Sequence, residues 1–390
     1  MSRPRRIPAV LMRGGTSKGL FFRLEDLPGA AREPGPARDR LLQRLCGSPD
    51  PYGTQIDGLG GATSSTSKVV ILSRTDRADH DVDYLFGQVM IDRPGVDWSG
   101  NCGNLTAAAA AFALHTGLVD PSRVPQDGAC TVRLWQANTG RTILAQVPLQ
   151  GGEVQEGGDF LLDGVAFASA GITLSFIDPS DGEGDLLPTG APQDVLEVPG
   201  VGRVDASLVN AGIATVFVRA RDLGCTGTET RDAVNADAAL LARLEAVRVA
   251  GALRMGLISD AAQGAQRAHS PKLVMVAPPA GFTASDGRAV RAEDIDLLTR
   301  AVSMGRLHHA MMGTASVAIA AAAAVPGTLV HEAAGGRPRD PLRFGHPAGT
   351  LSVGAQAECV DGRWRVTRAT MTRSARVLMD GHVHLPPDFL

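Results

Sequence analysis

Aromatic residues are scarce in this chain, and its charges nearly cancel. Phe, Trp and Tyr make up 4% of the 390 residues, and 38 Lys and Arg stand against 41 Asp and Glu, a formal net charge of −3. Sheets that bind RNA or single-stranded DNA need aromatic platforms and a basic surplus. A near-neutral chain also lacks a field that steers it to nucleic acid or to an anionic membrane. We therefore expect neither class of partner.

Closely spaced cysteines and long apolar runs are also missing. The cysteines are Cys46, Cys102, Cys130, Cys225 and Cys359. An odd number of widely spaced cysteines, without a CxxC pair, indicates neither a disulfide framework nor a structural zinc site, and it favours a reducing compartment. The longest apolar run, 315–325, falls short of the ~20 residues that span a bilayer. The apolar segment 7–12 is too short for a signal-peptide core. We therefore expect a soluble, cytoplasmic protein.

Short segments with the period of a β-strand dominate the sequence, and a few helical segments interrupt them. Strands are predicted at 7–12, 20–22, 68–73, 88–91, 131–136, 142–148, 172–177, 207–213, 215–218, 273–277 and 350–356. Helices are predicted at 36–45, 104–117, 232–256 and 303–325. The second and the fourth helix are nearly all apolar, and such a helix must be surrounded on every side.

An internal repeat sets the expected architecture. Asn101-Cys102-Gly103-Asn104 precedes one Ala-rich helix, and Met311-Met312-Gly313-Thr314 precedes the other. Low complexity could produce two alanine runs by chance, but the shared glycine and small polar entry argue against it. The repeat predicts an α/β (α+β) fold of two similar halves, each a curled, mostly antiparallel sheet around a central helix. We expect halves at 1–188 and 189–375, with a C-terminal strand near 376–390 joining the first half; the Pro/Gly/Asp-rich stretch 178–192 is the best linker candidate.

Cys102 is the cysteine placed for chemistry. Glycines flank it and a helix begins directly after it, and a helix N-terminus binds carboxylates and favours a thiolate. The alternative is a small buried residue at a helix start. The other four cysteines lack such a setting and are interpreted as structural.

Lys68 is the second candidate. It ends the hydroxyl-rich segment 60–68 and leads directly into an apolar strand. Partial burial would lower its pKa toward the range of a general base, and the hydroxyls of Ser64, Ser65 and Ser67 are suitable donors to an anion. A phosphate loop is the rival interpretation, but the GxxxxGK[ST] spacing is absent. A solvated lysine at a strand edge is the other alternative.

Three weaker signals remain. Arg13 and Ser17 lie in a Gly-rich connection that suits close approach to a carboxylate. Lys272 introduces the predicted strand 273–277 and is a candidate to bind an anion. His308 and His309 are adjacent and lack a metal-binding spacing, so we interpret them as structural and predict no metal site.

These motifs together resemble one known family. RGGTSKG at 13–19, GGATSSTSK at 60–68, WSGNCGN at 98–104 and MGRLHHAMMGT at 304–314 occur in the order found in the 2-methylaconitate cis–trans isomerases, within the diaminopimelate epimerase-like superfamily. DVDYLFG at 81–87 and RFGHPAG at 343–349 resemble the same family. The match covers essentially the whole chain.

The resemblance implies an active site in the cleft between the two halves and cofactor-independent proton transfer at carbon. It implies a small tricarboxylate as substrate, a place in the 2-methylcitrate route of propionate breakdown, and leaves homo-oligomerisation open. Diaminopimelate epimerases carry a catalytic cysteine in each half, but here Met312 occupies the second position. A thioether cannot move a proton, so two-thiol racemisation is excluded.

The implied chemistry is removal of an allylic proton, rotation about the former double bond, and reprotonation. Lys68 is the favoured base and Cys102 the acid, or the reverse. The implied substrate-binding residues are Arg13, Ser17, Ser64, Ser65, Ser67, Asn101, Gly103, Asn104, Lys272, Met312, Gly313 and Thr314. Isomerisation or tautomerisation of a related tricarboxylate, such as oxalomesaconate or aconitate, is the nearer alternative. A catalytically silent anion-binding protein is the other, and the presence of both Lys68 and Cys102 argues against it.

Overall fold

The computed structural model describes residues 5–180, 185–386 and 389, and its contacts divide the chain into two compact units. The first unit contains the chain up to Phe160, Ala168–Leu174 and the C-terminal segment from Arg373 onward. The second contains Leu161–Phe167 and Ser175–Thr372. After Leu174, just before the stretch 178–192 that we interpret as a linker, the chain stays in the second unit until Thr372. Residues 181–184 of that stretch lie outside the described part.

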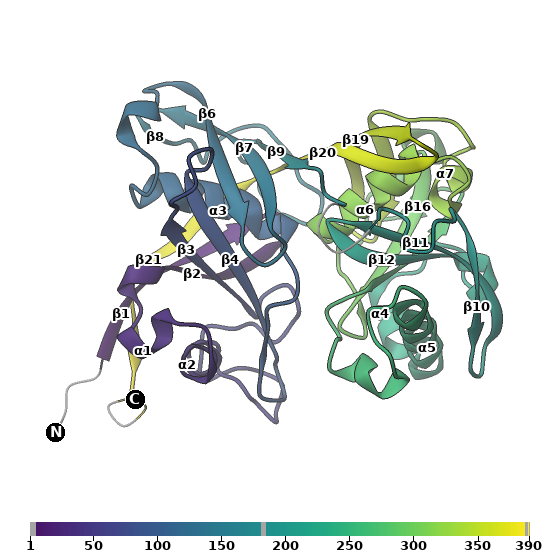
Figure 1. Cartoon of the computed structure of the whole chain (residues 1–390), viewed down its shortest axis with the longest axis horizontal. Coiled ribbons are helices and arrows are strands. Elements are labelled where there is room, and N and C mark those ends of the chain that lie inside the picture. Colours follow the sequence, from purple (N-terminus) through teal and green to yellow (C-terminus); the bar gives the residue numbers. More distant parts are fainter. Residues whose placement is uncertain (1–4, 181–184, 387–388, 390) are drawn as a thin grey trace. The chain divides into compact units, whose positions relative to one another are not determined.

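In the first unit, strands surround one apolar helix (Figure 1). The strands are β1 (Arg5–Gly14), β2 (Ser17–Arg23), β3 (Lys68–Arg74), β4 (Val82–Val89), β5 (Val96–Asp97), β6 (Gly128–Gln136), β7 (Arg141–Gln150), β8 (Glu153–Val154) and β21 (Ala375–Leu385), and β9 (Ile172–Ile177) begins here. The helices are α1 (Gly29–Arg32), α2 (Pro36–Cys46) and α3 (Gly103–His115), with 3-10 turns η1 (Leu24–Asp26) and η2 (Pro121–Arg123).

The sheet of the first unit is mixed, and it curls around α3. β1 pairs antiparallel with both β21 and β2, β2 pairs parallel with β3, and β3 pairs antiparallel with β4. β4 then pairs parallel with β6, which pairs antiparallel with β7. α3 contacts β1, β2, β3, β6, β7 and β21. The predicted arrangement of a curled sheet around a central helix is confirmed in this unit.

The sequence of α3 explains its central place. Every residue from Gly103 to Ala113 is buried. Alanine has the highest helix propensity and a small side chain, so the helix forms without a polar face and strands approach it from all sides. The helix ends at His115, and Gly117 follows with a φ of +66°.

The second unit repeats this plan. Its strands are β10 (Asp194–Val198), β11 (Gly202–Ala211), β12 (Ile213–Arg219), β13 (Lys272–Ala277), β14 (Phe282–Thr283), β15 (Ala289–Val290), β16 (Leu297–Ser303), β17 (Arg306–Leu307), β18 (Leu342–His346), β19 (Gly349–Val360) and β20 (Arg363–Arg373), whose last residue, Arg373, belongs to the first unit. Its helices are α4 (Arg231–Ala236), α5 (Ala238–Arg254), α6 (Gly313–Ala324) and α7 (Leu329–Ala333), with 3-10 turns η3 (Ala220–Leu223), η4 (Ala261–Ala265) and η5 (Ala292–Asp294).

The order of strand pairs is the same in both units. β11–β12 is antiparallel, β12–β13 parallel, β13–β16 antiparallel, β16–β18 parallel and β18–β19 antiparallel. This is the series that runs from β1 to β7 in the first unit. α6 follows the short strand β17 as α3 follows β5, and it contacts β11, β12 and β19. The predicted repeat of two similar halves is therefore confirmed strand by strand.

Two predicted helices have different bounds from those observed. The prediction of a helix from 303 is wrong, because Ser303 ends β16, and the turn at Met304 (φ +51°) and Gly305 (φ +71°) leads into β17. α6 begins at Gly313. The predicted helix 232–256 is two helices, because Asp237 leaves helical geometry and its side chain accepts the N–H of Leu240 to cap α5.

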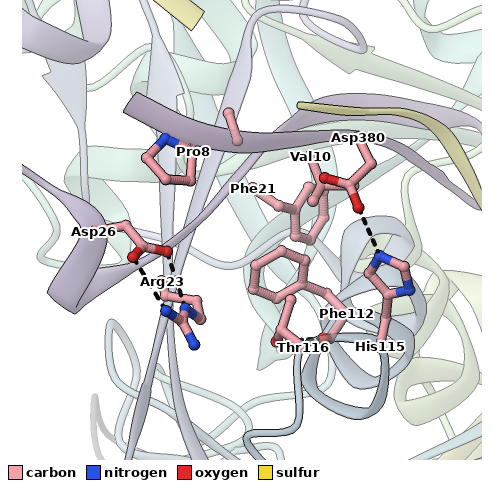
Figure 2. Close-up of a pocket in the computed structure, with 10 residues that line it drawn as sticks. Pro8, Val10, Phe21, Arg23, Asp26, Phe112, His115, Thr116 and Asp380 are labelled. Atoms are coloured by element: carbon pink, nitrogen blue, oxygen red, sulfur yellow. Dashed lines mark hydrogen bonds and ion pairs between the residues drawn. The ribbon is translucent and has the colours of Figure 1, made fainter. Parts of the chain in front are cut away.

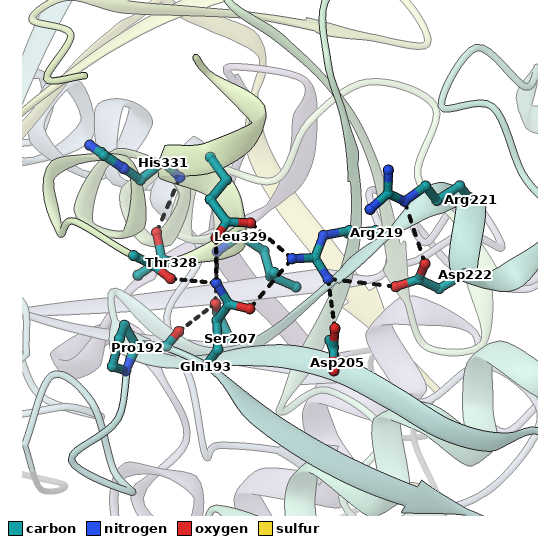
Figure 3. Close-up of polar contacts among 12 residues, drawn as sticks. Pro192, Gln193, Asp205, Ser207, Arg219, Arg221, Asp222, Thr328, Leu329 and His331 are labelled. Atoms are coloured by element: carbon teal, nitrogen blue, oxygen red, sulfur yellow. Dashed lines mark hydrogen bonds and ion pairs between the residues drawn. The ribbon is translucent and has the colours of Figure 1, made fainter. Parts of the chain in front are cut away.

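A polar network fixes the chain that follows α6 (Figure 3). Thr328 caps α7, and its hydroxyl donates to the carbonyl of Ala322 at 2.6 Å. Ser207 of β11 accepts the N–H of the first residue of α7 at 2.9 Å, and Arg219 of β12 forms an ion pair with Glu332 at 2.8 Å. These contacts tie α7 and the end of α6 to the sheet. Of the helices in the described residues, none has both the length and the apolar character needed to cross a membrane.

Candidate functional site

Lys68 begins β3 and lies in the interior of the first unit. The residue is 6% exposed, so the alternative of a solvated lysine at a strand edge is wrong. Its Nζ donates to Oε1 of Gln88 at 2.6 Å and lies 4.9 Å from the centroid of the Phe86 ring. Both partners come from β4, the antiparallel neighbour of β3. The lysine is thus held by a neutral amide and an aromatic face.

Cys102 is the N-cap residue of α3 and is 7% exposed. Its Sγ lies 4.0 Å from Oγ of Ser17, the first residue of β2. Its carbonyl accepts the hydroxyls of Thr106 at 3.1 Å and Tyr84 at 3.3 Å, which fixes the backbone at the helix start. The Cys102 side chain does not cap the helix. The thiol therefore lies at the positive end of a 13-residue helix dipole.

Lys68 and Cys102 interact directly. Burial lowers the pKa of Lys68, whereas the negative charge of the Cys102 thiolate and a side-chain hydrogen bond to it raise that pKa. The effect of burial is the larger, so the amine releases its proton more readily than an ordinary lysine. A buried amine and thiol in contact form a pair that can take up a proton and return it.

A buried arginine, absent from the predicted site, lies beside the same helix end. Arg373 ends β20, is 1% exposed, and donates from Nε to Oδ1 of Asn104 at 2.8 Å. Burial lowers the pKa of Arg373 to about 10, and the charge of Cys102 opposes this. Asn104 also donates from Nδ2 to Thr16 Oγ1 at 3.0 Å. The Asn104 side chain therefore links Arg373 to Thr16. Its predicted contact with substrate stays a prediction.

The glycines of the β1–β2 connection allow it to pack on α3. A Cβ on Gly14 would lie 2.7 Å from the carbonyl oxygen of Asn104, and a Cβ on Gly15 would lie 2.5 Å from Asn104 Oδ1. Gly15 also has a φ of +50°. In the structure, what this Gly-rich connection approaches closely is the first turn of α3. Its predicted approach to a carboxylate stays a prediction.

Arg13, which we expect to bind a carboxylate, is engaged within the first unit. Its guanidinium donates to the carbonyl and to Oγ of Ser374, both at 3.0 Å, and to Oγ of Ser169 at 3.2 Å. The side chain therefore joins the β1–β2 turn to the segment after β20. Its contact with substrate stays a prediction.

The hydroxyl-rich segment before Lys68 is partly used for structure. Ser67 is fully buried and donates to Oε1 of Gln55 at 2.8 Å. The carbonyl of buried Ser65 accepts the N–H of Lys18 at 3.0 Å, and Ser64 is half-buried. Ser67 has no second proton to donate to an anion. The substrate-binding roles of all three serines stay predictions.

Asn101 directly precedes Cys102 and is also buried, and its predicted contact with substrate stays a prediction. It is 4% exposed, and its Oδ1 has no hydrogen-bond partner in the described part of the chain. A buried carbonyl oxygen left without a donor costs about 1–3 kcal/mol. A bound molecule or water at this position would satisfy it.

The second unit carries an equivalent set of residues. Lys272 begins β13, is 2% exposed, and donates from Nζ to Ser303 Oγ at 2.9 Å, with His269 Nδ1 at 3.2 Å. Met312 is the N-cap of α6 as Cys102 is of α3, and Gly313 and Thr314 follow it, both buried. Its carbonyl accepts the Ser316 hydroxyl at 3.0 Å, as that of Cys102 accepts the hydroxyl of Thr106. The predicted equivalence of the two helix entries is confirmed.

The two adjacent histidines and the remaining cysteines have ordinary environments. His308 Nδ1 accepts the N–H of Ala310 at 3.1 Å, and its ring stacks on that of His309 with centroids 4.5 Å apart. All five cysteines are free, and Cys359 alone among them is exposed, on β19. Within the described residues, no group of three or more His, Cys, Asp or Glu could hold a metal ion.

A pocket of about 280 Å³ opens at the other end of α3 (Figure 2). It is lined by Pro8, Ala9, Val10, Phe21, Arg23, Asp26, Phe112, His115, Thr116 and Asp380. His115, the last residue of α3, pairs with Asp380 of β21 at 3.2 Å. The pocket shares no residue with the predicted site.

Sequence reasoning missed Gln88, Tyr84 and Arg373. Gln88 begins the predicted strand 88–91, but that prediction is wrong in its bounds, because Gln88 lies next to the end of β4 (Val82–Val89). Tyr84 lies in the segment 81–87 that carries the family resemblance. Arg373 gave no signal, because it comes 271 positions after Cys102 and reaches α3 only through the return of β20.

The repeated topology and the solved structures it matches define a protein with the diaminopimelate epimerase-like fold. The structure matches a crystal structure of methylitaconate-delta-isomerase with a TM-score of 0.77 and 35% identity, covering 98% of this chain and 96% of that one. It also matches a hydroxyproline epimerase from Agrobacterium vitis with a TM-score of 0.56 and 16% identity, covering 98% and 93%, which bears on the fold alone.

The chain belongs to the PrpF protein family, whose model matches residues 4–386. It is 62% identical over 385 residues to a 2-methyl-aconitate isomerase from Shewanella oneidensis (98% of this chain, 97% of that one). It is 60% identical over 387 residues to another from Cupriavidus necator (98% of each). A 4-oxalomesaconate tautomerase from Pseudomonas putida is 38% identical over 387 residues (98% and 97%). The resemblance stated from the motifs is therefore confirmed.

Proposed function

We propose that this protein is an isomerase that interconverts cis and trans 2-methylaconitate by removal and return of an allylic proton. One observation carries the proposal: Lys68 is buried, its Nζ donates to the neutral amide of Gln88, and it contacts Cys102 at the N-terminus of α3. The 60–62% identity to 2-methyl-aconitate isomerases over nearly the full chain supports the choice of substrate.

The chemistry needs a base, an acid and fixed positive charge. Lys68, or Cys102 as thiolate, takes the allylic proton, and the electron pair left behind spreads over the allyl and carboxylate groups. The former double bond then rotates, and a proton returned to the same allyl system restores a neutral carbon framework, so nothing is oxidised or reduced. Free N–H groups at a helix start bind carboxylates, and the Arg373 guanidinium adds positive charge nearby.

Lys272 is proposed to bind a second carboxylate of the substrate. Its buried Nζ has hydroxyl and imidazole partners, and in its ammonium form it would pair with a small anion where water screens the attraction little. The free state of all five cysteines supports a reducing compartment such as the cytoplasm.

A related tricarboxylate is the second candidate, because the tautomerase from Pseudomonas putida is 38% identical. One experiment separates the candidates. The protein is incubated in deuterated buffer with trans-2-methylaconitate, trans-aconitate or oxalomesaconate, and NMR follows isomer ratio and deuterium incorporation. Fastest conversion of 2-methylaconitate is expected. Faster conversion of another acid would replace the substrate, and no exchange into any of the three would overturn the proposed function.

A further inference from the structure

Gln88 lies directly opposite Lys68 in the β3–β4 register and is 1% exposed. Its Oε1 accepts Lys68 Nζ at 2.6 Å, and its Nε2 donates to the carbonyl of Ser67 at 2.9 Å. A backbone carbonyl can only accept, so the amide nitrogen must face Ser67 and the oxygen must face the lysine. The side chain therefore has one orientation, and that orientation presents an acceptor to Lys68.

A neutral acceptor is the partner that a basic lysine requires. An uncharged amine keeps two N–H groups and one lone pair, and a hydrogen bond from one N–H fixes the nitrogen without using the lone pair. A carboxylate in the same place would stabilise the ammonium form and raise the pKa of the lysine. The titratable group that faces Lys68 in the described structure is Cys102 of α3, and the charge of that thiol also acts on Tyr84 of β4 and Arg373 of β20.

The second unit also places a neutral side chain opposite a buried lysine. The pairing of Leu273 with Val302 places Lys272 beside Ser303, the position that Gln88 occupies relative to Lys68. Ser303 is again uncharged, and its hydroxyl accepts Lys272 Nζ at 2.9 Å. In both units a strand, β3 or β13, thus begins with a buried lysine. Each lysine donates to a neutral side chain on the antiparallel neighbour, β4 or β16.

Resting on the proposed function, we propose that Gln88 is a positioning residue, whose amide oxygen fixes the Lys68 amine beside the Cys102 thiol while adding no charge. It contacts no reacting atom itself and acts through Lys68. Its identity as an amide, and not as the isosteric carboxylate, keeps Lys68 available as a base.

The test compares Gln88→Glu, Gln88→Leu and the control Gln43→Glu, a buried glutamine on α2 whose Oε1 accepts the N–H of Gly95 at 2.9 Å. The readout is the pH profile of kcat/KM for deuterium exchange into 2-methylaconitate. In Gln88→Glu the ascending limb should move up by about one pH unit or more, with about a tenfold loss at neutral pH that recovers as pH rises. Gln88→Leu should lower kcat by about tenfold or more, without the upward shift and with little change in KM.

A second readout does not depend on turnover. The chain has three lysines, Lys18, Lys68 and Lys272, so competitive acylation followed by mass spectrometry reports the titration of Lys68 directly. We expect Lys68 to titrate at higher pH in Gln88→Glu than in the wild type or in Gln43→Glu. Equal titration of Lys68 in all three proteins would overturn the role of Gln88. Absence of exchange in the wild type, together with a shifted titration, would reject the proposed function and leave this role standing.

Discussion

Lys68 and Lys272 occupy the same place in the two units. Each is the first residue of a strand that pairs parallel with the strand before it and antiparallel with the next. Each is buried and donates to a neutral side chain on the antiparallel neighbour. The N-caps that accompany them differ, because Cys102 can exchange a proton and Met312 cannot. The repeat therefore places a buried lysine in both units and an ionisable thiol in one.

Lys272→Met is expected to weaken substrate binding more than it slows proton transfer. The substitution removes a positive charge but leaves Lys68 and Cys102 intact, so KM should rise about tenfold or more while deuterium exchange persists at saturating substrate. Lys68→Met is the contrasting variant and should abolish exchange. Steady-state kinetics of both variants measure the difference. A Lys272→Met enzyme with unchanged KM would refute the assignment of a carboxylate to Lys272.

Lys68→Met should also make the protein more stable at neutral pH. The folded state depresses the pKa of Lys68 below its usual 10.5, so the unfolded chain binds more protons and stability rises with pH through the window between the two pKa values. Methionine removes this cost. The cost is about 1.4 kcal/mol for each pKa unit by which the folded state lowers the pKa of Lys68. Chemical denaturation at several pH values should show the largest gain below the folded pKa and no gain above about pH 10.5. A variant less stable than the wild type at pH 7 would contradict it.

Much of the fold could be predicted, because its strongest signals are local. The alanine runs after Gly103 and Gly313, and the turns before them, indicate two buried helices and the repeat. β16 and β18 were missed because buried Arg300 and other polar residues interrupt their apolar pattern. The helix predicted from Ser303 failed because hydrophobic periodicity does not register a two-residue turn such as Met304-Gly305.

Two residues of the candidate site could be predicted from local sequence, whereas the contacts of the others could not. Lys68 and Cys102 each stand out through their immediate neighbours in the sequence, and the structure brings them together. What Arg13, Ser67 and Asn104 contact depends on residues far along the chain: Ser374, Gln55 and Arg373. Sequence patterns identify a residue suited to bind an anion, but they do not show that a distant partner already engages it.

Gly15→Ala should destabilise the first unit through contact as well as backbone strain. Gly15 has a φ of +50°, and a Cβ there would lie 2.5 Å from Asn104 Oδ1 and 3.0 Å from Arg373 Cδ. The matched control is Gly53→Ala, since Gly53 has a φ of +65° but open space around it. We expect a loss of about 1 kcal/mol for the control from strain alone. For Gly15→Ala we expect about 1–3 kcal/mol more, from overpacking. Urea denaturation measures both, and equal losses would show that Gly15 is needed for its φ and not for its approach to α3.

Cys102→Ala should move the pH profile in the direction opposite to Gln88→Glu. The thiolate of Cys102 raises the pKa of Lys68, so its removal leaves burial less opposed and the pKa falls further. The ascending limb of kcat/KM for deuterium exchange should therefore shift to lower pH, while the maximal rate falls because one member of the proton-transfer pair is gone. Cys46→Ala, at a buried thiol on α2 whose pKa burial raises to about 12, is the control and should leave the limb in place. An upward shift in Cys102→Ala would mean that the thiol does not act on Lys68 as an anion, and the limb would then report the titration of another group.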